Sequence, residues 1–230
     1  SWNAIETALA SFGPLPGRMR PLAGIHGCAL LDDSFSATPE SIQAALETLG
    51  ALPAERRIAV LGDMSDLGSE AEIAHRRVGQ TAAAQTDLLM TKGELAAVAA
   101  RAAASAGLPA DRIYVTYSAD DAIRLLRGVL QAGDLVLIKG GTAARMEQVT
   151  RALLASPAED VARLPRQDAG WRQVRLGRPG RPTWVEIDLD AIAANIRQLC
   201  QIVGPTVRIM AVLKADGYGH GAVKTARTAL

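Results

Sequence analysis

The sequence predicts an α/β protein with a Rossmann-like, doubly wound and mostly parallel sheet, followed by a linker and an incomplete (β/α) barrel segment. Short, wholly apolar segments such as residues 58–61 alternate with longer amphipathic segments over residues 14–155. Strands of a parallel sheet carry continuous apolar runs because helices cover both of its faces. The chain has 230 residues, 49% of them hydrophobic, which is enough for a sizeable core.

The individual elements follow from apolar spacing and from residues that start or stop helices. Helical spacing predicts a first helix over residues 3–12, which Gly13-Pro14 ends. A β-rich stretch then ends at residues 28–33, and Thr38 is the expected N-cap of a helix over residues 39–52. The further elements predicted are a strand at 58–61, a helix at 69–85, a strand at 87–90, a helix at 94–106, a strand at 112–116, a helix at 119–130, a strand at 135–138 and a helix that ends near Leu154.

The composition changes between residues 156 and 181, where Pro, Arg, Gly and Asp dominate, as is typical of a linker. We therefore expect the tail of a preceding domain at 1–13, the α/β domain at 14–155, the linker at 156–181 and a second unit at 182–230. The chain has no initiator Met and opens directly in a helix, so we expect it to begin inside a larger protein. The elements predicted for the second unit are a strand at 184–189, a helix at 190–203 and a strand at 208–213.

Charge and cysteine content limit the classes of partner. With 25 Lys and Arg against 24 Asp and Glu, no overall field favours nucleic acid or an anionic membrane, and we expect neither as a partner. No apolar run approaches the ~20 residues that span a bilayer, and no signal peptide opens the chain, which favours the cytoplasm. Cys28 and Cys200 lack metal-ligand spacing, so we expect two buried, reduced thiols and no metal site in the chain.

Three predicted strands end in polar or Gly-rich residues: Asp32-Asp33-Ser34, Gly62-Asp63-Met64 and Lys139-Gly140-Gly141. Ligands of doubly wound sheets lie beyond the carboxyl ends of the strands. Paired carboxylates there can bind ribose hydroxyls or a metal, and a Lys beside glycines can approach a phosphate. The alternative is structural: the acidic pair begins a turn, and the glycines only allow close packing. Because neither a P-loop nor a GxGxxG fingerprint is present, this domain should not supply the main phosphate cradle.

Lys214 closes the apolar segment 209–213 and precedes a Gly-rich turn. An amine held at a strand end by an apolar, desolvated stem suits Schiff-base chemistry with a carbonyl. The alternative is that Lys214 merely starts a solvated turn.

Five blocks follow one another over the α/β domain: Pro16-Gly17-Arg18-Met19-Arg20, Leu31-Asp32-Asp33-Ser34-Phe35-Ser36-Ala37-Thr38-Pro39-Glu40-Ser41, Ala59-Val60-Leu61-Gly62-Asp63-Met64 with Leu67-Gly68, His75-Arg76-Arg77-Val78-Gly79, and Gly133 to Gly140 with Arg145-Met146-Glu147. Together and in this order they resemble the C-terminal domain of the MurF-type Mur ligases. The resemblance implies ATP-dependent addition of D-alanyl-D-alanine to a UDP-N-acetylmuramoyl tripeptide, through an acyl phosphate that the dipeptide's amine attacks. ATP with Mg²⁺ would be bound mainly by a central domain, of which residues 1–13 would be the tail.

The same resemblance implies roles for individual residues. Arg18 would approach the nucleotide phosphates, Asp33 the ribose, and Lys139 the cleft between the domains. The residues expected to bind substrate are Asp32, Ser36 and Thr38.

The chain also departs from the family pattern at positions expected to bind substrate. The family usually has Tyr, Asn and Asn where this chain has Phe35, Ser36 and Thr38, and Ser-Arg where it has Gly141-Thr142. These changes remove hydrogen bonds each worth about 1 kcal/mol or more, which affects dipeptide specificity before it affects the fold. His75 and Arg76 are expected on a helix surface without a catalytic role.

The second unit carries two further blocks, Pro182 to Ala191 and Val212-Leu213-Lys214-Ala215-Asp216-Gly217-Tyr218-Gly219-His220-Gly221. They resemble the start of alanine racemases of the pyridoxal-phosphate-dependent barrel type. The resemblance implies that Lys214 links the pyridoxal 5'-phosphate and acts as a base toward alanine, that Tyr218 contacts the cofactor phosphate, and that His220 is structural. A complete barrel takes about 250 residues, so this segment should be inactive within the chain and loosely ordered.

These features together predict a piece of a bifunctional peptidoglycan-precursor enzyme, in which the racemase makes the D-alanine that the ligase consumes as the dipeptide. The piece alone should lack both activities. One alternative is a noncatalytic module, derived from a Mur ligase, that binds a nucleotide or a partner. A dehydrogenase-like Rossmann domain is disfavoured by the missing Gly-rich fingerprint.

Overall fold

The α/β domain is built on one sheet of six strands, in the order β1-β2-β6-β3-β4-β5. The structure is a computed structural model that describes residues 2–11, 13–168 and 185–230. Strand β1 is antiparallel to β2, and all other neighbours are parallel, which confirms the mostly parallel sheet. The strands are β1 (Arg20–Ala23), β2 (Ala29–Asp33), β3 (Arg56–Gly62), β4 (Leu88–Lys92), β5 (Ile113–Thr116) and β6 (Asp134–Lys139).

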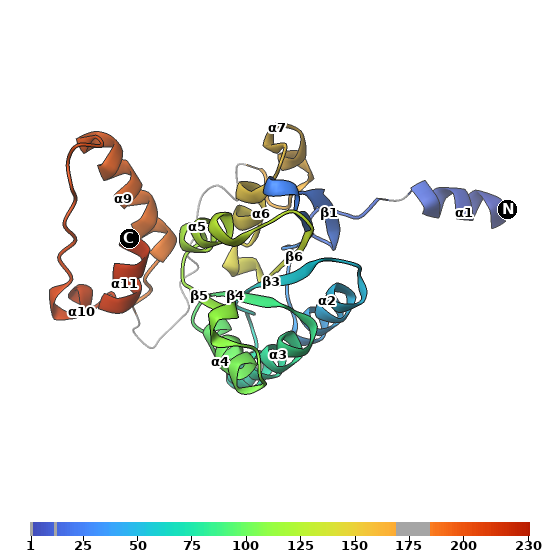
Figure 1. Ribbon diagram of the computed structural model, residues 1–230, viewed down its shortest axis with the longest axis horizontal. Coiled ribbons are helices and arrows are strands. Elements are labelled where there is room, and N and C mark those ends of the chain that lie inside the picture. Colours follow the sequence, from blue (N-terminus) through green and yellow to red (C-terminus); the bar gives the residue numbers. More distant parts are fainter. Residues whose placement is uncertain (1, 12, 169–184) are drawn as a thin grey trace.

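Helices cover both faces of this sheet, as expected for strands that are buried on both sides (Figure 1). One face packs against α2 (Pro39–Ala51), α3 (Ala71–Gln85) and α4 (Ala96–Ser105). The other packs against α5 (Ala119–Val129) and α6 (Glu147–Leu153). The doubly wound architecture predicted from the sequence is thus confirmed.

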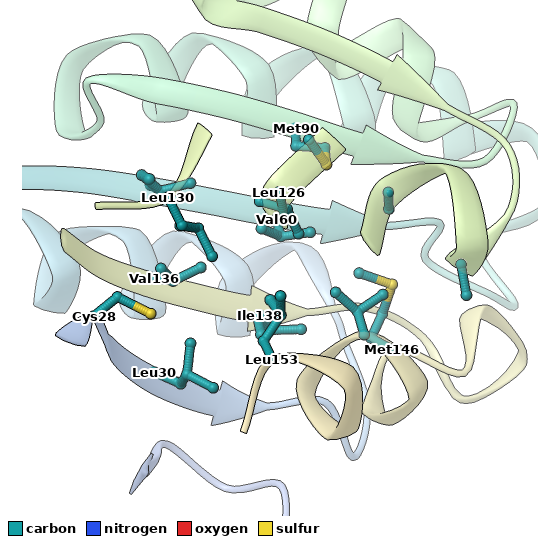
Figure 2. Close-up of a cluster of buried hydrophobic side chains, with 14 of the residues drawn as sticks. Cys28, Leu30, Val60, Met90, Leu126, Leu130, Val136, Ile138, Met146 and Leu153 are labelled. Carbon is teal, nitrogen blue, oxygen red and sulfur yellow. The ribbon is translucent and has the colours of Figure 1, made fainter. Parts of the chain in front are cut away.

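Alternation along the strands divides the core between the two faces. In β6, Val136 and Ile138 join the cluster under α5 and α6, whereas Leu135 and Leu137 join the cluster under α2, α3 and α4. Figure 2 shows the cluster under α5 and α6, which includes Leu126 of α5 and Val60 of β3. A fully buried aliphatic side chain contributes roughly 1.5–3 kcal/mol, so these two layers hold the sheet between its helices.

Two helices begin at side-chain caps, of which the one at Thr38 was predicted from the sequence. The Thr38 side chain accepts a hydrogen bond from the Ser41 amide, and the Ser41 hydroxyl accepts one from the Thr38 amide. Ser118 caps α5 through the Asp121 amide. Such caps stabilise a helix by about 1 kcal/mol.

The N-terminal helix predicted at residues 3–12 is α1 (Trp2–Ser11), and it projects away from the sheet (Figure 1). Short 3-10 helices complete the turns of the domain at Ile25–Gly27, Gly68–Glu70, Ala110–Arg112 and Thr142–Ala144. Among the described residues no helix is long and apolar enough to cross a membrane.

The first part of the segment predicted to be a linker is folded onto the domain. Residues Pro157–Asp160 form α7, a 3-10 helix follows at Val161–Arg163, and Leu164 is buried in the core. A composition rich in Pro, Arg, Gly and Asp therefore did not prevent this segment from packing on the domain, because apolar residues such as Leu164 anchor it. The rest of the predicted linker, residues 169–181, lies outside the described residues.

Residues 185–230 contain α9 (Leu189–Val203), α10 (Lys214–Tyr218) and α11 (Ala222–Ala229). The helix expected at 190–203 is confirmed, but the two strands expected around it are not formed among the described residues. An isolated strand has no neighbour to satisfy its backbone groups, and three apolar residues of the second predicted strand, Ile209, Met210 and Val212, are exposed. The prediction that both cysteines are buried holds for Cys28 and is wrong for Cys200, which is exposed on α9.

Candidate functional site

The central pair of the candidate site is Asp33 at the end of β2 and Lys139 at the end of β6. The two residues are partners in the parallel ladder. Lys139 Nζ lies 2.6 Å from Asp33 Oδ2, and the two side chains are only 2% and 9% exposed. Lys139 also donates to the carbonyl of Ser36 at 3.0 Å. Both charges are therefore engaged with each other and with the loop after β2.

Arg18 belongs to the same cluster through the loop that precedes β1. The other oxygen of Asp33 accepts a hydrogen bond from the Met19 amide at 3.1 Å, which holds this loop against the strand end. Arg18 itself is exposed, donates to Ser36 Oγ at 3.1 Å and lies 4.2 Å from the centroid of the Phe35 ring. Arg18, Asp33 and Lys139 thus gather at one edge of the sheet, as expected, but among the described residues Lys139 is buried against Asp33 and Ser36 and does not face a cleft.

Gly17 allows the Arg18 loop to lie close to its neighbours. It has a φ of 68°, in the left-handed region, and a Cβ at this position would lie 2.8 Å from Pro165 Cγ and 2.9 Å from the Phe35 nitrogen. Any larger residue would displace the loop and, with it, Arg18.

Asp32 occupies a different environment from Asp33, because successive strand residues point to opposite faces. It is fully buried and accepts a hydrogen bond from Thr150 Oγ1 of α6 at 2.8 Å. Burial raises the pKa of the Asp32 carboxyl above its ordinary range, against hydrogen bonds from Ser34 and Thr150 that lower it. This location disagrees with the predicted substrate contact, since Asp32 faces α6 rather than the edge.

Ser36 and Thr38, the other residues predicted to bind substrate, lie in the loop between β2 and α2. Ser36 is half-buried and carries bonds to Arg18 and Lys139. Thr38 is exposed and caps α2. The capping alternative for Thr38 is therefore confirmed, and Ser36 holds the cluster together.

A neighbouring ion cluster was missed as a site by the sequence reasoning. Glu147 at the start of α6 lies 2.6 Å from both Arg145 and Arg166. Burial raises the pKa of Glu147, but the hydrogen bonds from Arg166 and Arg145 outweigh burial, and the net pKa lies below the ordinary range. Arg166 also donates to the carbonyls of Ser34 and Phe35. It escaped notice because it stands in a segment with linker composition.

The end of β3 carries a third polar group. Asp63 Oδ1 accepts a hydrogen bond from the Ala96 amide at 2.6 Å, and burial raises the pKa of its carboxyl. His75, expected on a helix surface, is only 1% exposed. Its Nε2 accepts from the Met64 amide at 3.0 Å, and its Nδ1 lies 2.7 Å from the Ala71 carbonyl. His75 is therefore a structural residue that fixes the loop after β3.

Lys214 and Tyr218, the predicted cofactor-binding residues of the second unit, lie together on α10. Lys214 Nζ is 6.0 Å from the centroid of the Tyr218 ring, and both residues are exposed. The expected desolvation of the amine is absent, because the apolar segment before it packs into no barrel. His220 Nδ1 lies 2.8 Å from the Gly217 carbonyl, which agrees with a structural role.

The described residues contain no group of three His, Cys, Asp or Glu side chains that could hold a metal ion. They also do not enclose a pyridoxal phosphate at Lys214, since that lysine is exposed.

Comparison with known proteins separates the chain into two parts. A family model described as Mur ligase, glutamate ligase domain, matches residues 17–142, and one described as Alanine racemase, N-terminal domain, matches residues 187–230. The UDP-N-acetylmuramoyl-tripeptide–D-alanyl-D-alanine ligase of Escherichia coli (strain K12) is 34% identical over 152 residues, covering 66% of this chain and 32% of that ligase. An alanine racemase of a Nostoc species is 60% identical over 47 residues, covering 20% of this chain and 12% of the racemase.

Solved structures agree with the first part. The MurF ligase from Thermotoga maritima, crystallised in complex with ADP, has a TM-score of 0.54 and 25% identity, covering 64% of this chain and 32% of that one. A MurF from Acinetobacter baumannii has a TM-score of 0.57 at 23% identity, covering 65% of this chain and 33% of that one, and supports the fold alone. The chain thus spans only part of the length of each relative. It belongs to the Mur ligase family, whose C-terminal domain it contains, and it continues into the N-terminal part of an alanine racemase domain.

Proposed function

We propose that the chain is the junction of a bifunctional peptidoglycan-precursor enzyme. Its first part would serve the ATP-dependent addition of D-alanyl-D-alanine to a UDP-N-acetylmuramoyl tripeptide, and its second part would open a pyridoxal-phosphate-dependent alanine racemase. One matched relative is an alanine racemase, and the other is a ligase that adds D-alanyl-D-alanine. Because both act on alanine or its dipeptide, their chemistry supports a fusion of the two in one chain. A cytoplasmic location stays a prediction.

The observation that carries the ligase proposal is the cluster of Arg18, Asp33 and Lys139 at the carboxyl edge of the sheet. Arg18 is the exposed cation of this cluster, and it would approach the phosphates of ATP held with Mg²⁺ by a central domain. Asp33 is buried and already accepts hydrogen bonds from Lys139 and the Met19 amide. Its geometry supports a positioning role for the Arg18 loop better than the direct ribose contact predicted from the family.

In this arrangement the chain's own residues do three things. The Lys139 ammonium anchors the loop after β2 through the Ser36 carbonyl. The Asp33 carboxylate anchors the loop before β1. Arg18 is then held at the edge by Ser36 and Phe35, so its side chain would lose little conformational entropy when it meets the nucleotide. Its positive charge would stabilise the negative charge that develops on a transferring phosphoryl group.

The racemase proposal rests on the short racemase match and on the block around Lys214. Because Lys214 is exposed here, no step of racemisation is assigned to this arrangement. The chain alone should therefore lack both activities, since the ATP-binding central domain and most of the barrel lie outside the matched parts.

The alternative is a noncatalytic module that binds a nucleotide or a partner. The observation that favours it is that Ser36 and Thr38 replace two amides of the family pattern and are used in structural bonds. ADP release by the intact parent distinguishes the two. We expect release that requires both the UDP-linked tripeptide and D-alanyl-D-alanine. Nucleotide binding without substrate-dependent release would reject the ligase proposal and support the module.

A further inference from the structure

Another charged cluster lies at the β4–β5 end of the same sheet edge, where the ligase domain meets the racemase segment. Lys92 ends β4, and its side chain is only 8% exposed. Its Nζ donates to the Ala144 carbonyl at 3.1 Å and lies 3.2 Å from Asp190 Oδ2. Asp190 belongs to the first turn of α9 in the racemase segment. An ammonium buried this deeply is costly without counter-charges. Asp63 at the end of β3 attracts the Lys92 ammonium within the ligase domain, and Asp190, whose side chain is 32% exposed, forms an ion pair with it from the racemase segment.

The other oxygen of Asp190 binds the start of a helix in the ligase domain. Asp190 Oδ1 accepts a hydrogen bond from the Ala119 amide, the first residue of α5, at 2.7 Å. The N-terminus of a helix presents unpaired amides and partial positive charge. One carboxylate from the racemase segment is thus held by a buried ammonium and a helix N-terminus, both from the ligase domain.

Charges around this contact are complementary. Asp120 of α5 pairs with Arg197 of α9, and Glu94 pairs with Lys224 of α11. The Lys224 ammonium also lies 5.4 Å from the centroid of the Tyr117 ring. The ligase side presents one cation and two carboxylates, and the racemase side presents one carboxylate and two cations.

We propose that the racemase segment docks on the β4–β5 end of the ligase sheet, with Asp190 seated between Lys92 and the N-terminus of α5. Helices α9 and α11 both contact α5, and Figure 1 shows them beside that end of the domain. The strand order separates β4 and β5 from β2 and β6, which carry Asp33 and Lys139. Docking therefore occupies the β4–β5 end of this edge and leaves the exposed Arg18 at the other end uncovered.

The test compares the chain with Asp190→Asn, Lys92→Met and the double variant. Asp190→Asn keeps the shape of the side chain and removes its charge, so we expect the Ala119 amide to exchange hydrogen about tenfold faster, as for the loss of one charge-assisted hydrogen bond. Lys92→Met should also speed the exchange of the Ala119 amide, because it removes the ammonium that holds the Asp190 carboxylate in place. The double variant should exchange no faster than Asp190→Asn alone, because Lys92 acts on the Ala119 amide only through Asp190.

Glu186→Gln is the matched control, because Glu186 is an exposed carboxylate in the same segment. A fluorophore on the exposed Cys200 of α9 gives a second readout. Its anisotropy should fall in the Asp190 and Lys92 variants and stay unchanged in the control. The proposal is overturned if Asp190→Asn leaves both readouts at their original values, if the two substitutions add, or if Glu186→Gln has the same effect.

Discussion

The ammonium group of Lys139 lies 2.6 Å from the carboxylate of Asp33, a residue 106 positions earlier in the chain. The two residues end neighbouring parallel strands, so the pair exists only when β2 and β6 have met in the correct register. Lys139 of this pair also binds the loop after β2 through the Ser36 carbonyl, and Asp33 binds the loop before β1 through the Met19 amide. The placement of Arg18 therefore depends on a buried ion pair that Arg18 does not touch.

Lys139→Met should lower the free energy of unfolding by about 3–5 kcal/mol, because it leaves Asp33 charged and buried without its partner. Urea unfolding of the chain measures this change. The double variant Lys139→Met, Asp33→Leu should recover a large part of the loss, since no unpaired charge then remains. Equal stability of Lys139→Met and the unmodified chain would show that the pair contributes little.

Arg18→Ala in the intact parent should slow ATP-dependent ligation by on the order of 10²-fold, the usual effect of removing one donor aimed at transition-state charge. Steady-state ADP release measures the rate. Arg101→Ala, which removes an exposed cation on α4, is the control and should have no effect. Unchanged ligation in Arg18→Ala would count against a role for Arg18 at the phosphates.

The pH dependence of stability should reveal Asp32. Burial raises the pKa of this carboxyl above its ordinary value of 3.8, so the folded state keeps its proton to higher pH than the unfolded state does. The Asp32 carboxyl therefore makes its full contribution to the free energy of unfolding below pH 3.8, and this contribution is lost as pH rises through the pKa of the group in the folded state. The amide side chain introduced by Asp32→Asn cannot ionise, so this variant does not lose that stability. As pH rises from 3.8 through the folded-state pKa of Asp32, the free energy of unfolding of the variant should therefore increase relative to that of the unmodified chain.

Urea unfolding at a series of pH values measures this difference, and Asp111→Asn, at an exposed position, serves as the control. A difference between Asp32→Asn and the unmodified chain that stays constant with pH would contradict the assignment.

The two cysteines should react at very different rates with a maleimide. Burial, followed by the charge of Asp134, raises the pKa of Cys28 to about 11, so little thiolate is present at neutral pH. Cys200 is exposed. Mass spectrometry should detect one label on the native chain, at Cys200, and two after denaturation. Labelling of both thiols in the native chain would show that the core around Cys28 opens readily.

Lys214 should carry a borohydride-trappable adduct with pyridoxal 5'-phosphate in the intact parent but not in this chain. In the chain the lysine is exposed and unenclosed, so any imine should form weakly and without selectivity. Peptide mapping after reduction locates the adduct. An adduct on another lysine of the parent would refute the assignment of Lys214.

Much of the α/β domain was predictable from local patterns. Wholly apolar runs identified the parallel strands, because only strands covered on both faces can omit alternation. Thr38 and Pro39 marked the start of α2. The meeting of Asp33 and Lys139 was also predictable, since parallel strands bring their carboxyl ends to one edge, whereas Arg18 was assigned there by the family resemblance.

The environment of each polar residue was not predictable in the same way. His75 proved to be buried because it bonds the Met64 amide, a partner that no spacing rule reveals. Arg166 bonds residues more than a hundred positions away. Lys214 and the apolar segment before it resemble a barrel strand in sequence, but the described residues provide no neighbouring strand.

Within the α/β domain, the sequence by itself thus determined which segments become strands and helices and at which edge of the sheet the polar residues collect, because these depend on local spacing and backbone preference. Only the tertiary structure decided that Asp33 is paired and Asp32 is buried against α6, and that Asp190 meets Lys92. These outcomes depend on which charges share a low-dielectric interior, and that is set by contacts between residues far apart in the chain.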